Sequence, residues 1–420
     1  MTEPDKTADE LYAEREQRLL DAIALRQPDR VPTIFYSTFW AARQAGMTCE
    51  QAMYDYQGLS SAMREAIVKL QPDAYMPCHA VIALGPTMEK LGFKQLKWPG
   101  DGETNPDVSF QYLDREYMSA GEYDDYLEDP TAFYLQKYLP RLAEGFEPLA
   151  LIPDYPSIHY TRILHTLASF AQPEFRKGIE RLIQSGEEVQ AMMEEARSSV
   201  KEMKELGFPI ANAASGTAPF DVISDYMRGS KGGMLDMFRN KEKLLAAMEK
   251  AANSIPRNIV RTAQRLPSKI VFIPLHWGLD GFMSPDQFET FFWPTLRKVI
   301  CTLVDAGLHP CLFWEGDCTS RLETIKDVPA GKCIYFFERT DIFKAKEVLG
   351  DTVCIRGGMP VNTLINGTPD QVRERCKELI DVVGEGGGYI MDAGVGIPDE
   401  AKAENVQAMF DFTREYGVYR

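Results

Sequence analysis

Short runs of apolar, β-branched and aromatic residues recur along the chain, and long amphipathic segments separate them. The first run, residues 31–39 (VPTIFYSTF), follows a helical pattern over residues 10–26 that ends before Pro28. Runs of this length and composition predict buried strands. The comparable runs that follow are residues 74–78, 149–153, 210–214, 270–277, 310–314, 333–337, 353–356 and 388–391.

Helical patterns fill most of the intervals between these runs. The long ones are residues 174–206, 241–265, 285–306, 340–349 and 369–383. Alternation of strand and helix predicts parallel βαβ units, and about eight such units fit one closed (β/α)8 barrel better than two doubly wound sheets. Since the runs number one more than eight, one of them should lie outside the barrel. We therefore expect an α/β fold with a single TIM-type barrel, residues 29–420, after a helical extension, residues 1–28.

Composition and charge narrow the classes of partner. Of the 420 residues, 45% are hydrophobic and 26% are charged, which is typical of a globular protein with a large core. Asp and Glu number 62 against 46 Lys and Arg, a net charge of −16, so nucleic acid is not expected as a partner. No apolar run reaches the ~18 residues of a membrane span, and the acidic N-terminus does not resemble a targeting peptide. We expect a cytoplasmic protein with no membrane partner.

The eight cysteines are dispersed and include no CxxC pair. This spacing predicts neither a disulfide framework nor a zinc finger. Five of the cysteines lie between residues 301 and 354 in apolar segments, where buried, reduced thiols are the expected state.

Polar residues follow three consecutive predicted strands at the point where each strand ends. His276 and Trp277 close one run, Glu315 follows the next, and Glu338 follows the third. The carboxyl ends of barrel strands form the active site of this fold. Because buried carboxylates are costly unless paired, protonated or metal-bound, a His with two carboxylates indicates a zinc ion with an open position. The alternative is structural: Glu338 in an ion pair, Glu315 in a loop cap and His276 in the core.

Aromatic residues lie at or just beyond the same strand ends. Phe39, Trp40, Trp277 and Trp314 could line a flat-walled apolar cavity for a planar substrate, or they could be core residues. The segment Ser215-Gly216-Thr217 also follows a strand, but no His and Asp pattern accompanies it, so no serine nucleophile is predicted.

The C-terminal third carries motifs that resemble the uroporphyrinogen decarboxylase superfamily. The matching segments are residues 387–398 (GGYIMDAGVGIP), 404–406 (ENV), 414–417 (REYG), 28–32 (PDRVP) and 367–369 (GTP). The resemblance implies a (β/α)8 barrel. Decarboxylases carry a His in the final turn, where this chain has Val395, whereas residues 43–46 (RQAG) are similar to a decarboxylase segment. A decarboxylase-like enzyme therefore stays one alternative.

The other large branch of the superfamily contains corrinoid-dependent methyltransferases, including methylcobamide:coenzyme M enzymes. These bind zinc through a His-x-Cys-Gly segment, a later acid and a final Cys. Residues 313–316 (FWEG) align with the first segment, so that Glu315 replaces the Cys, Glu338 matches the acid and Val395 replaces the last Cys. The resemblance thus implies a harder zinc site, with His276 as the nitrogen ligand. A thiol or amine methyltransferase of this branch is a second alternative.

A site of this kind resembles the methyltransferase component of aryl methyl ether O-demethylase systems. The resemblance implies a Zn²⁺ enzyme that takes the methyl group from a small, methoxylated aromatic donor. The acceptor would be cob(I)alamin on a separate corrinoid protein, because this chain lacks an Asp-x-His-x-x-Gly motif.

Residue roles follow from the same resemblance. Glu315 would act as a catalytic metal ligand, and Tyr36 or Asp317 would donate a proton or hydrogen bond to the leaving oxygen. The aromatic residues Phe39, Trp40, Trp277 and Trp314 would bind the ring. The apolar segment 288–293 fits either core or an interface, which leaves both a monomer and a homodimer open.

Overall fold

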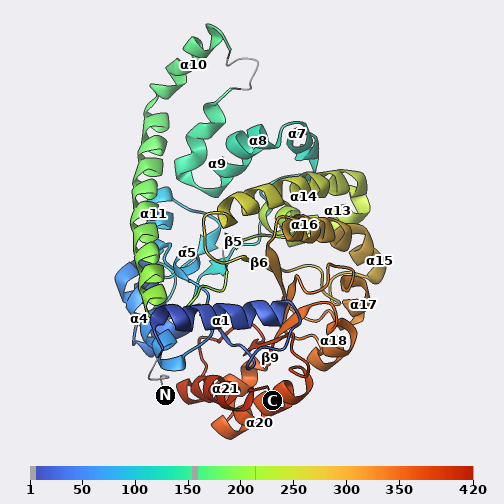
Figure 1. Cartoon of the computed structure of the whole chain (residues 1–420). Helices are drawn as coiled ribbons and strands as arrows, with labels where there is room; N and C mark the ends of the chain where they lie inside the picture. The colour runs from blue at the N-terminus through green and yellow to red at the C-terminus, as the bar shows by residue number, and fades with distance from the viewer. Residues whose placement is uncertain (1–5, 154–158, 213, 420) are drawn as a thin grey trace.

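A parallel sheet of six strands forms most of a barrel (Figure 1). The computed structural model describes residues 6–153, 159–212 and 214–419. The strand order is β10-β9-β8-β7-β6-β5. These strands are β5 (Ala214–Ser215), β6 (Ile270–Leu275), β7 (His309–Trp314), β8 (Ile334–Phe337), β9 (Cys354–Met359) and β10 (Tyr389–Ala393).

Two further strands close the barrel. β1 (Ile34–Phe35) pairs in parallel with β2 (Ala74–Tyr75). A parallel bridge between Thr33 and Met391 joins β1 to β10, and a bridge between Tyr75 and Ile210 joins β2 to the segment that leads into β5. The described residues therefore form a closed barrel of eight parallel strands, which confirms the predicted fold class.

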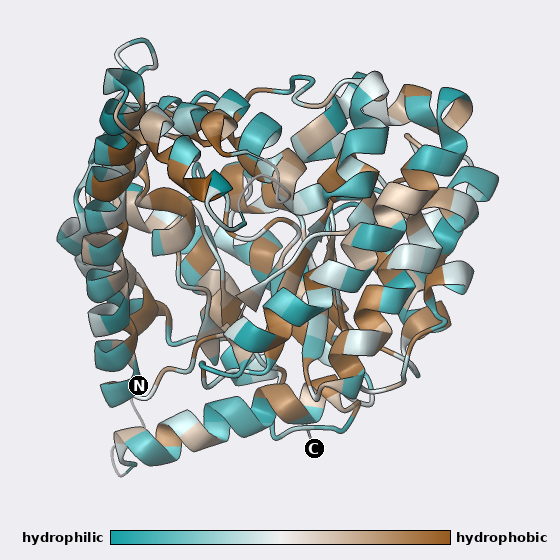
Figure 2. Ribbon diagram, turned by 90° about the horizontal axis from the view of Figure 1, so that it is seen from above, coloured by the Kyte–Doolittle hydropathy of each residue, from teal (hydrophilic) through white to brown (hydrophobic). Residues whose placement is uncertain are grey.

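Helices surround this barrel, and their ribbons alternate between hydrophilic and hydrophobic residues, as amphipathic helices do (Figure 2). Those on the barrel are α1 (Ala8–Ile23), α2 (Trp40–Gln44), α3 (Cys49–Tyr54), α4 (Tyr56–Leu70), α5 (His79–Ile82), α6 (Gly85–Leu91), α12 (Pro219–Ile223), α13 (Gly229–Arg239), α14 (Lys241–Ala263), α15 (Pro285–Gln287), α16 (Trp293–Asp305), α17 (Leu322–Ile325), α18 (Ile342–Leu349), α19 (Val361–Asn366), α20 (Pro369–Val382) and α21 (Ala403–Tyr416). No helix in the described part of the chain is long and apolar enough to cross a bilayer.

An inserted region lies at one end of the barrel. It contains a small antiparallel pair, β3 (Leu96–Lys97) with β4 (Gln111–Tyr112), and the helices α7 (Tyr123–Glu128), α8 (Pro130–Phe133), α9 (Leu139–Leu142) and α10 (Arg162–Phe170). The long helix α11 (Pro173–Glu205) runs from this end along the barrel, as Figure 1 shows.

One strand prediction is wrong. Residues 149–153 were expected to form a strand, but Leu149 and Leu151 belong to the 3₁₀ segment η3 (Glu144–Leu151). A short apolar run has no periodicity that separates a strand from a turn of helix. Residues 149–151 lie outside the barrel strands, which agrees with the prediction that one of the nine runs does so.

Burial decides one open alternative and confirms one prediction. Phe288, Phe291, Phe292 and Trp293 are all buried, so the apolar segment 288–293 belongs to the core. The cysteines are unpaired, and all except the half-buried Cys301 are buried, as predicted.

Side chains of the barrel strands alternate between two apolar clusters. Phe272, Phe313 and Phe336 belong to the cluster inside the barrel, where neighbouring rings stack with centroids 5.8 Å and 4.4 Å apart. Leu312 and Trp314 belong to the cluster between the strands and the helices. Because successive residues of a strand face opposite sides, the residue after Trp314 should face inward again.

Candidate metal and substrate site at the mouth of the barrel

The carboxyl ends of β6 and β7 bring two predicted site residues together. Leu275 on β6 is paired with Trp314 on β7, so the next residues, His276 and Glu315, are neighbours. His276 Nε2 lies 3.5 Å from Glu315 Oε1. The alternation of side chains directs Glu315 inward, two residues after the interior ring of Phe313.

Glu338 lies on the next strand but takes a different partner. Phe337 is paired with Trp314, so Glu338 follows beside Glu315 at the strand ends. Its carboxylate Oε1 lies 3.2 Å from Arg339 Nε, on the neighbouring residue. It is not one of the described acids whose ligand atoms converge around His276. A metal-ligand role for Glu338 therefore stays a prediction.

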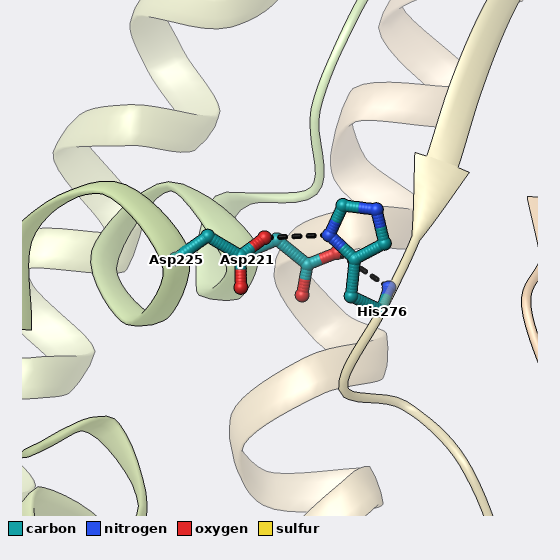
Figure 3. Close-up of side chains that lie close together, drawn as sticks. All are labelled: Asp221, Asp225 and His276. Atoms are coloured by element: carbon teal, nitrogen blue, oxygen red, sulfur yellow. Dashed lines mark hydrogen bonds and ion pairs between the residues drawn. The ribbon is translucent and has the colours of Figure 1, made fainter. Parts of the chain in front are cut away.

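Two aspartates that the sequence analysis missed surround His276. Asp221 lies in α12 and Asp225 in the following π-helical turn η5 (Ser224–Arg228). Asp221 Oδ2 accepts the backbone N–H of His276 at 3.0 Å, and Asp225 Oδ2 lies 2.6 Å from His276 Nδ1 (Figure 3). One ligand atom from each of these three residues lies within 4.8 Å of the other two.

A signal for these acids was present in the sequence. Asp221 stands in an apolar stretch between Phe220 and Ile223, and Asp225 follows it by one helical turn. An acid in such a stretch, just after a predicted strand, lies at the same end of the barrel as His276. The prediction for this strand end concerned only Ser215-Gly216-Thr217, four residues before Asp221.

Asp221 is the least satisfied acid of the group. It is fully buried, and its Oδ1 has no hydrogen-bond partner among the described residues. Burial, with the nearby charge of Asp225, raises the pKa of Asp221 well above its usual value. An unpartnered carboxylate oxygen in such surroundings is costly unless a proton or a cation compensates it. One imidazole nitrogen with carboxylate oxygens is a donor set that fits a divalent ion such as Zn²⁺.

His276 is held by acids through both ring nitrogens. Burial alone would lower the pKa of this imidazole, but the hydrogen bonds with Asp225 and Glu315 outweigh it and raise the pKa to about 11. Without a metal, His276 is thus protonated at neutral pH and supplies the positive charge of the cluster. A divalent ion would take the place of that proton.

An aromatic pair, Trp277 and Phe282, lies beside the cluster, and we refer to it as the aromatic rim. The indole N–H of Trp277 donates a hydrogen bond to Asp225 Oδ1, so one carboxylate holds both Trp277 and His276. The rings of Trp277 and Phe282 meet edge to face with centroids 5.0 Å apart. Phe282 is 46% exposed, so the rim offers an accessible apolar surface next to the acids.

Tyr36 lies inside the barrel close to these groups. Its ring packs edge-on against Phe272, with centroids 5.7 Å apart, and against Phe336 at 6.3 Å. Burial raises the pKa of Tyr36 to about 12, and the charge of Glu315 contributes to the rise. The phenol therefore keeps its proton at neutral pH and can act as a hydrogen-bond donor.

Four other predicted residues make their contacts with groups outside the cluster. Trp314 is fully buried on the outward side of β7 and packs against Tyr335. Phe39 is fully buried against Phe110, and the Trp40 indole donates to the Ala401 carbonyl at 2.8 Å. The exposed Asp317 accepts hydrogen bonds from the backbone and hydroxyl of Thr319 at 2.9 and 2.6 Å. Substrate-binding or catalytic roles for these residues stay predictions.

Comparison with known proteins agrees with this class of barrel. Residues 166–416 match the family model of uroporphyrinogen decarboxylase (URO-D). The chain therefore belongs to the uroporphyrinogen decarboxylase family, as its motifs predict.

Curated relatives share parts of the sequence. The uroporphyrinogen decarboxylase of Chlorobium phaeovibrioides is 26% identical over 139 residues, which are 32% of this chain and 38% of that protein. The enzyme of the same name from Carboxydothermus hydrogenoformans is 23% identical over 202 residues, 47% of this chain and 56% of that protein. The chain thus matches less than two thirds of the length of these relatives.

A solved structure matches over nearly the whole fold. A methyltransferase from Methanosarcina mazei superimposes with a TM-score of 0.62 at 16% identity and covers 96% of this chain and 98% of its own. At this identity the similarity shows a shared fold.

Proposed function

We propose that this protein is a zinc-dependent methyltransferase. It removes the methyl group of a small, methoxylated aromatic donor and transfers it to the cob(I)alamin of a separate corrinoid protein. The observation that carries the proposal is the buried Asp221, whose unpartnered oxygen lies beside His276 and Asp225 at the carboxyl ends of the strands. The shared fold with a methyltransferase supports the same class.

Asp221, Asp225 and His276 would hold the metal. Glu315 lies on the other, Nε2 side of the imidazole, where it would orient the ring, and its role as a metal ligand stays a prediction. Carboxylate and imidazole ligands leave a metal more Lewis-acidic than thiolates do. When bound, the zinc ion supplies a Lewis acid for the ether oxygen, while the corrinoid of the partner protein accepts the methyl group.

The chain's own residues would orient the donor and stabilise the leaving oxygen. An ether methyl group is a poor electrophile because its leaving group is a phenoxide, so a hydrogen bond to that oxygen favours the reaction. Tyr36 keeps its proton and can donate this bond. Trp277 and Phe282 would stack on the ring of the donor. Asp317 is the other predicted donor, although Thr319 already occupies one of its oxygens.

Decarboxylation is the second candidate, because the curated relatives are decarboxylases by name. The geometry favours methyl transfer, since the acids around His276 would repel a porphyrinogen that carries many carboxylates. A thiol or amine methyltransferase would need the same metal but a different donor.

The proposal can be tested by following the cobalt spectrum. The zinc-loaded protein is mixed anaerobically with cob(I)alamin and 4-methoxybenzamide, and methylcobalamin and the free phenol are measured together. We expect both products in equal amounts with the wild type and neither with Asp221→Asn. The exposed Glu249→Gln variant on α14 is the control and should behave as the wild type. Release of carbon dioxide from a porphyrinogen, without methyl transfer from ethers or thiols, would overturn the proposal.

A further inference from the structure

Four carboxylates gather at the mouth of the barrel, and we call them the mouth acids: Asp221, Asp225, Glu315 and Glu338. Two of them flank His276, with Asp225 Oδ2 2.6 Å from Nδ1 and Glu315 Oε1 3.5 Å from Nε2. Asp221 accepts the His276 backbone N–H. Glu338 lies beside Glu315 through the pairing of β7 with β8. Any donor that reaches the proposed metal must therefore approach several negative charges.

The arginines on the neighbouring strands and loops are already paired. Arg339 lies 3.2 Å from Glu338, and Arg356 lies 2.7 Å from Asp392 inside the barrel. Arg321 lies 3.0 Å from Asp280. Recognition of a substrate carboxylate normally uses an Arg or Lys that is free to form charge-assisted hydrogen bonds. Arg321 and Arg356 are buried, so neither reaches a donor at the mouth, and a donor carboxylate would compete with Glu338 for the exposed Arg339.

A bound divalent ion would not make the net charge at the mouth of the barrel positive. With His276 as a neutral ligand, the ion offsets two of the mouth acids and Arg339 offsets a third, so one negative charge stays uncompensated. The surfaces left for the body of the donor are the uncharged rings of Trp277, Phe282 and Tyr36. A ring without charge can be buried against them at no electrostatic penalty.

We infer that this site selects its methyl donor by charge and accepts uncharged aryl methyl ethers while it rejects those with a carboxylate on the ring. The inference rests on the proposed function, because it concerns the donor of that reaction. Apart from the metal itself, a ring carboxylate would lose water and gain no unpaired cationic side chain, which is unfavourable. It would also be repelled by the mouth acids, more strongly at low ionic strength.

Two probes of nearly equal size separate charge from shape. 4-Methoxybenzamide and 4-methoxybenzoate are titrated into the zinc-loaded full chain, and their dissociation constants are measured by isothermal titration calorimetry. We expect the amide to bind at least about tenfold more tightly, with the ratio narrowing as salt is added. Equal or tighter binding of the benzoate would overturn the inference.

A matched pair of variants tests the origin of the selectivity. Glu338→Gln leaves Arg339 unpaired beside the site, so it should narrow the amide-to-benzoate ratio by about threefold. Arg339→Gln should widen that ratio by a similar factor, and Glu249→Gln should leave it unchanged. Zinc content is measured for each variant. This measurement identifies a variant that binds neither probe because it has lost its metal. An amide-to-benzoate ratio that is unchanged in both Glu338→Gln and Arg339→Gln would contradict the inference.

Failure of this inference differs from failure of the proposed function. If the amide binds preferentially but no methyl group reaches cob(I)alamin, charge selection stands and the proposed reaction is wrong. If both ethers are demethylated with equal kcat/KM, the proposed reaction stands and charge selection is wrong.

Discussion

Asp225 and His276 are separated by 51 residues of sequence, yet Asp225 Oδ2 lies 2.6 Å from His276 Nδ1. This pair joins the helical turn after β5 to the end of β6. A carboxylate on one ring nitrogen fixes the imidazole, so that the other nitrogen faces Glu315. The same carboxylate accepts the indole N–H of Trp277, and the orientation of the aromatic rim is thereby coupled to the proposed metal site.

Asp225→Asn should weaken both the metal site and the aromatic rim. We expect about 10- to 100-fold lower zinc affinity, as for other residues that bind or orient a metal ligand. Trp277 fluorescence should shift as its hydrogen bond weakens. Competition with a chromophoric chelator measures the affinity. In the matched control, Trp277→Phe, zinc affinity should stay within about threefold of the wild type. If Trp277→Phe lowered zinc affinity as much as Asp225→Asn, the view that Asp225 serves the metal and Trp277 only the aromatic rim would be contradicted.

Tyr36→Phe should reduce turnover and leave binding intact. Removal of one hydrogen-bond donor to a developing oxyanion lowers kcat by about 10²-fold or more. The ring contacts with Phe272 and Phe336 are kept, so the dissociation constant of 4-methoxybenzamide should change little. Single-turnover kinetics with cob(I)alamin give the rate, and calorimetry gives the affinity. An unchanged rate would exclude Tyr36 as the donor.

The N-terminal helix should depend on a buried ion network. Asp73 is fully buried and pairs with Arg18 of α1 and, at 2.7 Å, with Arg30. Asp73→Asn leaves both arginines without their shared charge, so we expect the free energy of unfolding to fall by about 3–5 kcal/mol. Urea denaturation at pH 7 measures the loss. An exposed pair such as Lys298 with Glu249 provides the control, for which Glu249→Gln should cost less than about 1 kcal/mol.

His79 should make stability sensitive to mild acid. It is buried and its Nε2 lies 2.9 Å from Ser60 Oγ. Burial lowers the pKa of His79 below 6.5, although the charge of Glu195 opposes the shift. Below pH 6.5 the unfolded chain therefore binds a proton that the folded protein does not, and acid favours unfolding.

The matched variant for this effect is His79→Gln, which does not titrate in this range. As the pH falls from about 6.5 towards 5, the wild type should lose stability relative to the variant. Urea midpoints at several pH values measure the difference. Parallel pH profiles for the two proteins would contradict a lowered pKa at His79.

The ends of β7 and β8 show how far local sequence can predict the site. Glu315 follows a strand and, by alternation, must face inward, so its meeting with His276 follows from pattern alone. The same rule places Trp314 outward, against Tyr335, and it would have separated Trp314 from the other candidate ring-binding residues.

The positions of Asp221 and Asp225 cannot be predicted from strand alternation. Their approach to His276 depends on how α12 and η5 pack over the end of β6, which is a contact across more than 50 residues. The strand prediction for residues 149–153 is wrong for a local reason, because a five-residue apolar run fits a strand and a turn of 3₁₀ helix equally well. The division into residues 1–28 and 29–420 stays a prediction.

The central claim is that Asp221, Asp225 and His276 bind zinc, and the zinc content of the protein tests it most directly. Anaerobically purified wild type, Asp221→Asn and Glu249→Gln are supplied with one equivalent of Zn²⁺, desalted and analysed by inductively coupled plasma mass spectrometry, with circular dichroism as the check of folding. We predict about one zinc per chain in the wild type and in Glu249→Gln, and almost none in a folded Asp221→Asn protein. A folded wild type that retains no zinc, or an Asp221→Asn variant that retains all of it, would contradict the claim.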